Sequence, residues 1–122
     1  MEQVTIRNVT RATGIGTRIA VADTGLNRLI GLLGRKGLEP DAGLWIRPSS
    51  GVHTFGMRFP IDVIGLDRKL RVCAVWPKLR PWRISGVSWR IHSVLELPTG
   101  SIDRANIQRG DQLQVVQTSR ET

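Results

Sequence analysis

Apolar and polar residues alternate with a period of two along most of the chain, which is the pattern typical of β-strands. Short segments that alternate in this way, or that are apolar throughout, occur at residues 4–9, 18–22, 44–46, 59–66, 70–76, 91–97 and 113–115. No linker or internal repeat interrupts the 122 residues. We therefore expect a single domain over residues 1–122 that is mainly β (α+β), with a small antiparallel sheet curled into a barrel-like fold.

The main segment with a helical period lies near residues 23–36. Its apolar residues stand at positions i, i+3, i+4 and i+7: Leu26, Leu29, Ile30 and Leu33. Asp23 or Thr24 can cap the start of this helix, and Gly37 can supply the left-handed residue that ends it. Two internal glycines weaken the helix, so we expect it to depend on packing against the sheet. A short turn or second helix is expected near residues 101–106.

Asp62 is the most informative single residue, because it stands in the middle of the apolar run that predicts the fourth strand. On a strand it shares a face with Ile64 and Leu66. Burying an unpaired carboxylate is costly, so Asp62 needs donors, and Arg35, His53 or backbone amides can supply them. It is either a hydrogen-bonded hub that stabilises the fold or part of a binding or catalytic site.

A candidate ligand pocket follows if Arg35, His53, Thr54 and Asp62 converge beside the end of the helix. Such a pocket would suit a small polar or anionic ligand, and a small β-rich binding or accessory domain is our leading hypothesis. A hydrolase-like enzyme is an alternative, because His53 can act as an acid or base near neutral pH beside Asp62. No serine or cysteine elbow accompanies that pair, so the sequence leaves catalysis open.

The charge of the chain points to a further alternative. The formal net charge is +8, which attracts anions. Seven cations, three tryptophans and no acidic residue lie between residues 68 and 90. Cations beside aromatic rings bind single-stranded nucleic acids. The alternative function is thus nucleic-acid or anionic-surface binding through this basic segment, with contacts from Arg80, Trp82, Arg83 and Arg90. An arginine-rich background and tryptophans that complete the core would produce the same composition.

The chain shows no pattern typical of a metal site or a cofactor motif. Its two histidines, His53 and His92, are nearly forty residues apart, and the single cysteine, Cys73, has no partner for an internal disulfide. Residues 1–10 have no apolar core of signal-peptide length, and no apolar run has the length of a membrane span. We expect a cytoplasmic protein without a metal, a cofactor or a membrane-spanning segment.

Several short motifs occur in an order and at a spacing that identify a family resemblance. They are residues 31–35 followed by Leu38, residues 43–46, residues 60–62 leading into 66–67, residues 94–100, and residues 110–111. From Leu26 onward the chain resembles domain-of-unknown-function family 192. The resemblance implies a compact, β-rich fold and no particular activity. Its motif residues here are Arg35, Asp62, Glu96 and Asp111. We expect Glu96 to lie at a strand end and Asp111 in a turn, and we expect both to have structural roles.

One segment departs from the family pattern. Many members carry an aromatic residue, Trp, Met, Lys, Asn and Thr before the Pro-Leu-Asp element. The corresponding segment here, residues 52–57, reads Val52, His53, Thr54, Phe55, Gly56 and Met57. If this segment forms the family's site, the site in this chain has different chemistry.

Overall fold

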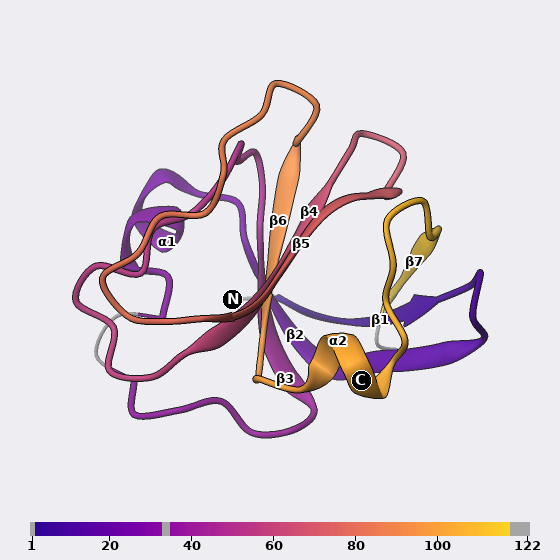
Figure 1. Ribbon diagram of the computed structural model, residues 1–122, viewed down its shortest axis with the longest axis horizontal. Coiled ribbons are helices and arrows are strands. Elements are labelled where there is room, and N and C mark those ends of the chain that lie inside the picture. The colour runs from indigo at the N-terminus through magenta and orange to yellow at the C-terminus, as the bar shows by residue number, and fades with distance from the viewer. Residues whose placement is uncertain (1, 33–34, 118–122) are drawn as a thin grey trace.

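The computed structural model describes residues 2–32 and 35–117, and its main feature is one curled sheet (Figure 1). Seven strands hydrogen-bond in the order β5-β4-β6-β3-β2-β1-β7. Their bounds are β1 (Gln3–Asn8), β2 (Thr13–Ala22), β3 (Ala42–Ile46), β4 (Ile61–Leu66), β5 (Val72–Leu79), β6 (Ser93–Leu97) and β7 (Leu113–Gln117). The mainly β prediction is confirmed, and each segment with strand-like patterning contributes to one of these strands.

The sheet curls into a half-barrel, which brings its two outer strands, β5 and β7, together at the start of each. The Val72 N–H at the start of β5 donates to the Asp111 carbonyl at 2.8 Å, and the Leu113 N–H of β7 donates to the Leu70 carbonyl at 2.9 Å. The pairing is antiparallel except between β2 and β3, which run parallel. A mostly antiparallel, barrel-like sheet is therefore confirmed, with one parallel pair that the sequence pattern did not predict.

The first helix is shorter than the predicted span of residues 23–36. Helix α1 (Gly25–Ile30) starts as expected, with the Asn27 N–H donating to the Thr24 hydroxyl at 3.1 Å. It ends at Gly31, whose φ of 51° is outside the helical range and favours glycine. The predicted stop at Gly37 is thus wrong, and Leu33 lies outside the described residues. The expected second helix is present as α2 (Ser101–Arg104).

The neighbouring strands β4 and β6 are buried on both faces along their whole length. Side chains alternate between the faces of a strand, so each strand contributes to two apolar clusters. We call the side that carries Ile64, Leu66, Leu95 and Leu97 the Asp62 face. The opposite side, which carries Ile61, Val63 and Val94, is called the Glu96 face, because the register places Val63 opposite Glu96.

Asp62 is 1% exposed, and both of its carboxylate oxygens accept a backbone hydrogen bond. The Lys78 N–H donates to Oδ1 at 2.9 Å, where the pairing of β4 with β5 is irregular. The Ile102 N–H donates to Oδ2 at 2.9 Å, which satisfies an amide in the first turn of α2. Backbone amides, rather than Arg35 or His53, are therefore its partners, and Asp62 joins β4 to both β5 and α2.

Neither α1 nor α2, the helices among the described residues, is long and apolar enough to cross a membrane. Cys73 is partly buried on β5, and its thiol donates to the Gly65 carbonyl at 3.4 Å. The cytoplasmic location stays a prediction.

Replacing Asp62 with alanine should lower the free energy of unfolding by about 2–5 kcal/mol, because it leaves the buried Ile102 amide and the partly buried Lys78 amide without an acceptor. Urea denaturation followed by circular dichroism measures this change. The matched control is Asp103→Ala on α2, where the side chain is exposed and the expected change is under about 1 kcal/mol. Equal stabilities of the two variants would contradict the role given to Asp62.

Candidate ligand-binding site

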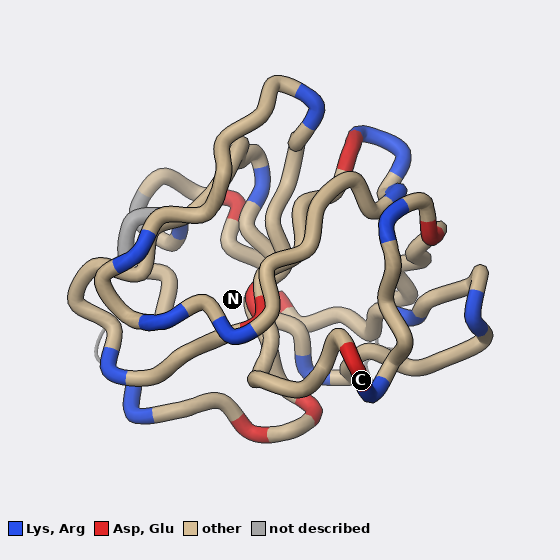
Figure 2. The backbone as a smooth tube through the Cα atoms, viewed as in Figure 1, with Lys and Arg blue, Asp and Glu red and all other residues tan. Residues whose placement is uncertain are grey.

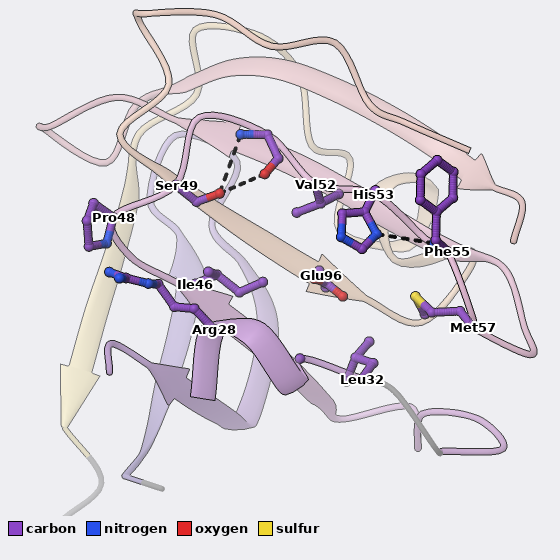
Figure 3. A pocket seen from close by; sticks show the side chains of 12 residues that line it. Arg28, Leu32, Ile46, Pro48, Ser49, Val52, His53, Phe55, Met57 and Glu96 are labelled. Carbon is purple, nitrogen blue, oxygen red and sulfur yellow. Dashed lines mark hydrogen bonds between the residues drawn. The ribbon is translucent and has the colours of Figure 1, made fainter. Parts of the chain in front are cut away.

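A cavity of about 230 Å³ lies on the Glu96 face, between α1 and the loop of residues 47–60 (Figure 3). Three parts of the chain supply its walls: α1 with the two residues that follow it, the end of β3 with the loop, and β6. The lining residues are Arg28, Gly31, Leu32, Ile46, Pro48, Ser49, Gly51, Val52, His53, Phe55, Met57 and Glu96. Six of these twelve residues have apolar side chains and four have polar ones, so the polar groups Arg28, Ser49, His53 and Glu96 determine which ligands fit.

Glu96 is the polar group that the fold buries in this cavity. The residue is 5% exposed and lies on β6, with every other residue of that strand also buried. Burial raises the pKa of the Glu96 carboxyl from its ordinary value of 4.5 to about 7. A group with this pKa can hold or release a proton near neutral pH, which is a property typical of functional sites.

Glu96 differs from the other two buried acids in its hydrogen bonding. Asp62 accepts two backbone amides, and Asp111 accepts the side chain of Asn8 at 2.9 Å and the backbone N–H of Gln108 at 3.0 Å. Within residues 2–32 and 35–117, no donor hydrogen-bonds the Glu96 carboxyl. The carboxyl is therefore available to a donor that a ligand brings into the cavity.

His53 and Phe55 form the aromatic part of the cavity wall. The Phe55 N–H donates to His53 Nδ1 at 3.3 Å, which leaves Nε2 to carry the proton of the neutral ring. The two rings stack with centroids 5.0 Å apart. Phe55 stacks in turn on Trp82, with centroids 6.0 Å apart. We call His53, Phe55 and Trp82 the aromatic row, and it reaches from the cavity to the outer surface.

Thr54 lies between the two aromatic residues of the wall but is fully buried. Its hydroxyl donates to the Arg80 carbonyl at 2.6 Å and accepts the Arg83 N–H at 2.9 Å. Its backbone N–H donates to the Arg83 carbonyl at 2.8 Å, and its carbonyl accepts the Trp82 N–H at 3.0 Å. Thr54 thus joins loop residues 52–57 to residues 80–83, and it positions His53 and Phe55. Direct ligand contact by Thr54 stays a prediction.

The structure does not bring Arg35 and Asp62 to this cavity. Arg35 is exposed and lines a separate depression with Arg18 and Glu39. Asp62 lies on the opposite face of β4, with both oxygens occupied by backbone amides. Of the four residues expected to converge, His53 lines the cavity, and Glu96 lines it too.

The basic segment does not form one continuous surface. Its cations at residues 68–71 lie in the turn between β4 and β5, whereas Arg80 and Arg83 follow the other end of β5, eight residues and roughly 25 Å away. Arg90 is near the first end, because the neighbouring His92 N–H donates to the Leu66 carbonyl at 2.8 Å. Figure 2 shows the basic positions spread around the molecule. Of the four predicted nucleic-acid contacts, Arg80, Trp82 and Arg83 are neighbours and Arg90 is apart.

The tryptophans of this segment also divide into two kinds. Trp76 is half-buried against the apolar cluster of the Glu96 face. Trp82 and Trp89 are 64% and 89% exposed, so neither completes the core. Trp89 packs against Arg90, with 5.6 Å between the guanidinium carbon and the ring centroid, and it is not part of the aromatic row.

The sequence predicts a structural role for Glu96 at a strand end and does not predict that this residue lines the cavity. A usable signal was present: Glu96 stands inside an apolar run, as Asp62 does. The places of Arg28 and Phe55 in the wall were missed too, because neither has a distinctive sequence context. The described residues contain no group of three or more His, Cys, Asp or Glu side chains that could hold a metal ion.

Comparisons with known proteins agree on a family and on the fold. The model of domain-of-unknown-function family 192, described as Uncharacterized ACR, matches residues 7–115. A UPF0127 protein from Pyrococcus furiosus is 32% identical over 110 residues, which are 88% of this chain and 94% of that protein. A UPF0127 protein from Thermococcus sibiricus is 33% identical over 104 residues, or 79% of this chain, and the match spans 64% of that relative's length.

A crystal structure of a protein of unknown function from Novosphingobium aromaticivorans superposes with a TM-score of 0.77. The match covers 91% of this chain and 82% of that one, at 21% identity. This similarity shows that the two chains share a fold.

The raised pKa of Glu96 predicts a specific dependence of stability on pH. Between about pH 4.5 and pH 7 the unfolded chain has released this proton and the folded chain still holds it, so wild-type stability falls as pH rises and then levels off. Glutamine has no proton to release in this range, so the Glu96→Gln variant does not lose stability in this way as pH rises. The variant should match wild type near pH 4.5 and exceed its free energy of unfolding by roughly 3 kcal/mol at pH 8.

Denaturant titrations at the two pH values measure the difference between variant and wild type. Glu2→Gln is the matched control, because Glu2 is exposed and its difference should stay under about 1 kcal/mol at both pH values. A Glu96→Gln effect that is the same at pH 4.5 and pH 8 would show that Glu96 does not titrate as described.

Proposed function

Because the chain belongs to domain-of-unknown-function family 192, whose description assigns no activity, we propose a function from its own cavity: it binds a small polar ligand that donates a hydrogen bond to Glu96. The observation that carries this proposal is a buried carboxyl that faces a cavity and has no donor among the described residues. Because this carboxyl borders the cavity, a ligand held there can donate a charge-assisted hydrogen bond to it, which is stronger than a neutral one.

The cavity supports further statements about the ligand. Its volume of about 230 Å³ is below the range typical of drug-sized ligands, which favours a single ring or a molecule of similar size. His53 and Phe55 offer flat aromatic surfaces for such a ring. Arg28 supplies a guanidinium in the wall, so the ligand can also carry an anionic group. Arg28 thus replaces Arg35 as the basis for proposing an anionic group.

Nucleic-acid binding is a second candidate, and a specific observation favours it. Trp82 is 64% exposed between two exposed arginines, Arg80 and Arg83, and it belongs to the aromatic row. Exposed rings beside cations suit stacking with bases and pairing with phosphates. The hydrolase-like alternative has no comparable support, because His53 and Asp62 lie on opposite sides of β4 and share no hydrogen bond.

Benzamidine is a suitable probe of the small-ligand proposal, since it joins a flat ring to an amidinium whose two NH2 groups donate hydrogen bonds. In two-dimensional NMR spectra it should shift the amide signals of Val52, His53, Phe55 and Met57. Its affinity should rise between pH 6 and pH 8 as Glu96 ionises. Glu96→Gln should weaken binding at pH 8 at least tenfold, because a charged hydrogen bond is lost.

Benzoate is the matched control ligand, because it has the same ring with acceptors in place of donors, and its binding should not weaken in Glu96→Gln. Benzamidine shifts of equal size and affinity in wild type and Glu96→Gln would overturn the role proposed for Glu96.

A further inference from the structure

The aromatic row extends from the cavity wall to the outer surface of the protein. His53 and Phe55 line the cavity, and Phe55 stacks on Trp82 with an angle of 27° between the ring planes. Phe55 is 42% exposed and Trp82 64% exposed, so each presents ring surface to solvent. Exposed apolar surface that extends from a cavity is typical of a binding site for a partner larger than the cavity.

The fold holds this row in place at some cost. Trp82 has a φ of 64°, which is rare for a bulky residue and strained. The hydrogen bonds of Thr54 to residues 80–83 maintain that conformation. A second connection lies next to it, where the Val52 N–H donates to the Ser85 hydroxyl at 2.9 Å and the Ser85 N–H donates to the Val52 carbonyl at 2.9 Å. The rings therefore form a preorganised surface rather than a loose cluster.

The charges around the row determine the class of partner. Arg80 and Arg83 flank Trp82 and are exposed, and the whole chain carries a net charge of +8. Cations that border a stacking surface suit a chain of phosphates with unpaired bases. An anionic lipid surface would be attracted by the same charges, but its headgroups offer no flat ring to stack on Trp82 or to enter the cavity.

We infer that the row and the cavity form one site for a single-stranded nucleic acid, with one base inserted beside Glu96 and a neighbouring base stacked on Trp82. The inference rests on the proposed function, since it names the class of ligand that enters the cavity. A cavity of about 230 Å³ accommodates one heterocycle and not two stacked ones. Insertion of an unpaired base into a pocket that reads its Watson–Crick edge is an established mode of recognition.

Glu96 also gives this site a base preference. An ionised carboxylate only accepts hydrogen bonds, so it selects an edge that presents adjacent N–H donors. Guanine presents the donors N1–H and N2–H side by side on its Watson–Crick edge. Thymine and uracil present one N–H between two carbonyl oxygens, which the carboxylate repels. Guanine is thus the expected inserted base, and thymine and uracil are the least favoured.

The test compares two fluorescein-labelled single strands by fluorescence anisotropy at pH 8: eleven thymidines, and the same strand with deoxyguanosine at its centre. Wild type should bind the guanine strand at least fivefold more tightly. Glu96→Gln should abolish this preference while retaining affinity for the thymidine strand. Trp82→Ala should weaken binding of both strands about fivefold or more, because a stacked base is lost.

Matched controls separate the site from general charge. Trp89→Ala removes a tryptophan that is outside the row and even more exposed than Trp82, and it should change affinity less than twofold. Replacing Arg80 and Arg83 together with alanine should reduce the slope of log affinity against log salt by roughly 1.4, whereas Arg7→Ala on β1 should leave it nearly unchanged. Thermal melts of each variant check that it is folded.

The outcomes separate the two proposals. Benzamidine binding without strand binding would overturn the inference and leave the small-ligand function standing. Strand binding that depends on Trp82 but shows no guanine preference would overturn base insertion beside Glu96. Binding to vesicles of phosphatidylserine and phosphatidylcholine, lost in Trp82→Ala and without strand binding, would replace the nucleic acid with a lipid surface. Guanine preference that disappears in Glu96→Gln alone supports the inference.

Discussion

The main physical constraint on this fold is that each of two neighbouring strands, β4 and β6, buries one carboxyl group. β4 and β6 are covered on both faces, so any acid within them must find donors or lose its charge. The pleat directs Asp62 and Glu96 to opposite faces of the sheet. On one face, two backbone amides satisfy Asp62 and join β4 to β5 and α2. On the other face, Glu96 meets a cavity and keeps its proton to about pH 7. Burial of a carboxyl thus stabilises one face through hydrogen bonds and places an ionisable group at a cavity on the other.

The loops determine what can reach Glu96. Thr54 uses its hydroxyl, its N–H and its carbonyl to join residues 52–57 to residues 80–83, although the two segments are far apart in the sequence. This connection places His53 and Phe55 on the cavity wall and Trp82 outside it. A buried polar residue in a loop therefore positions the exposed rings. The cavity wall at His53 and Phe55 consequently adjoins Trp82, which two exposed arginines flank in the sequence.

The sequence predicted the strands well because alternation of apolar residues directly reflects burial on one face. It predicted the helix too long, since the apolar spacing continues past Gly31, whereas the backbone at that glycine ends the helix. The partners of Asp62 were correctly limited to three possibilities, but the choice of backbone amides depends on how α2 meets β4. Nearness to the helix end in the sequence predicts Arg35 in the site, whereas the residue is exposed and lines a separate depression. The sequence does not reveal that Glu96 lines a cavity, because the residues that form the cavity with it come from segments far away in the sequence. The basic segment was read as one surface, whereas β5 separates its two ends.

Glu96 is the central element of this account, and its protonation can be observed directly. In ¹³C-labelled protein, the side-chain carboxyl signal of Glu96, assigned by its disappearance in Glu96→Gln, can be followed by NMR from pH 4 to pH 9. The account predicts a titration midpoint near pH 7, because burial without a donor disfavours the charged form. A midpoint near the ordinary glutamate value of 4.5 would show that the carboxyl is solvated or already paired, and it would contradict the account.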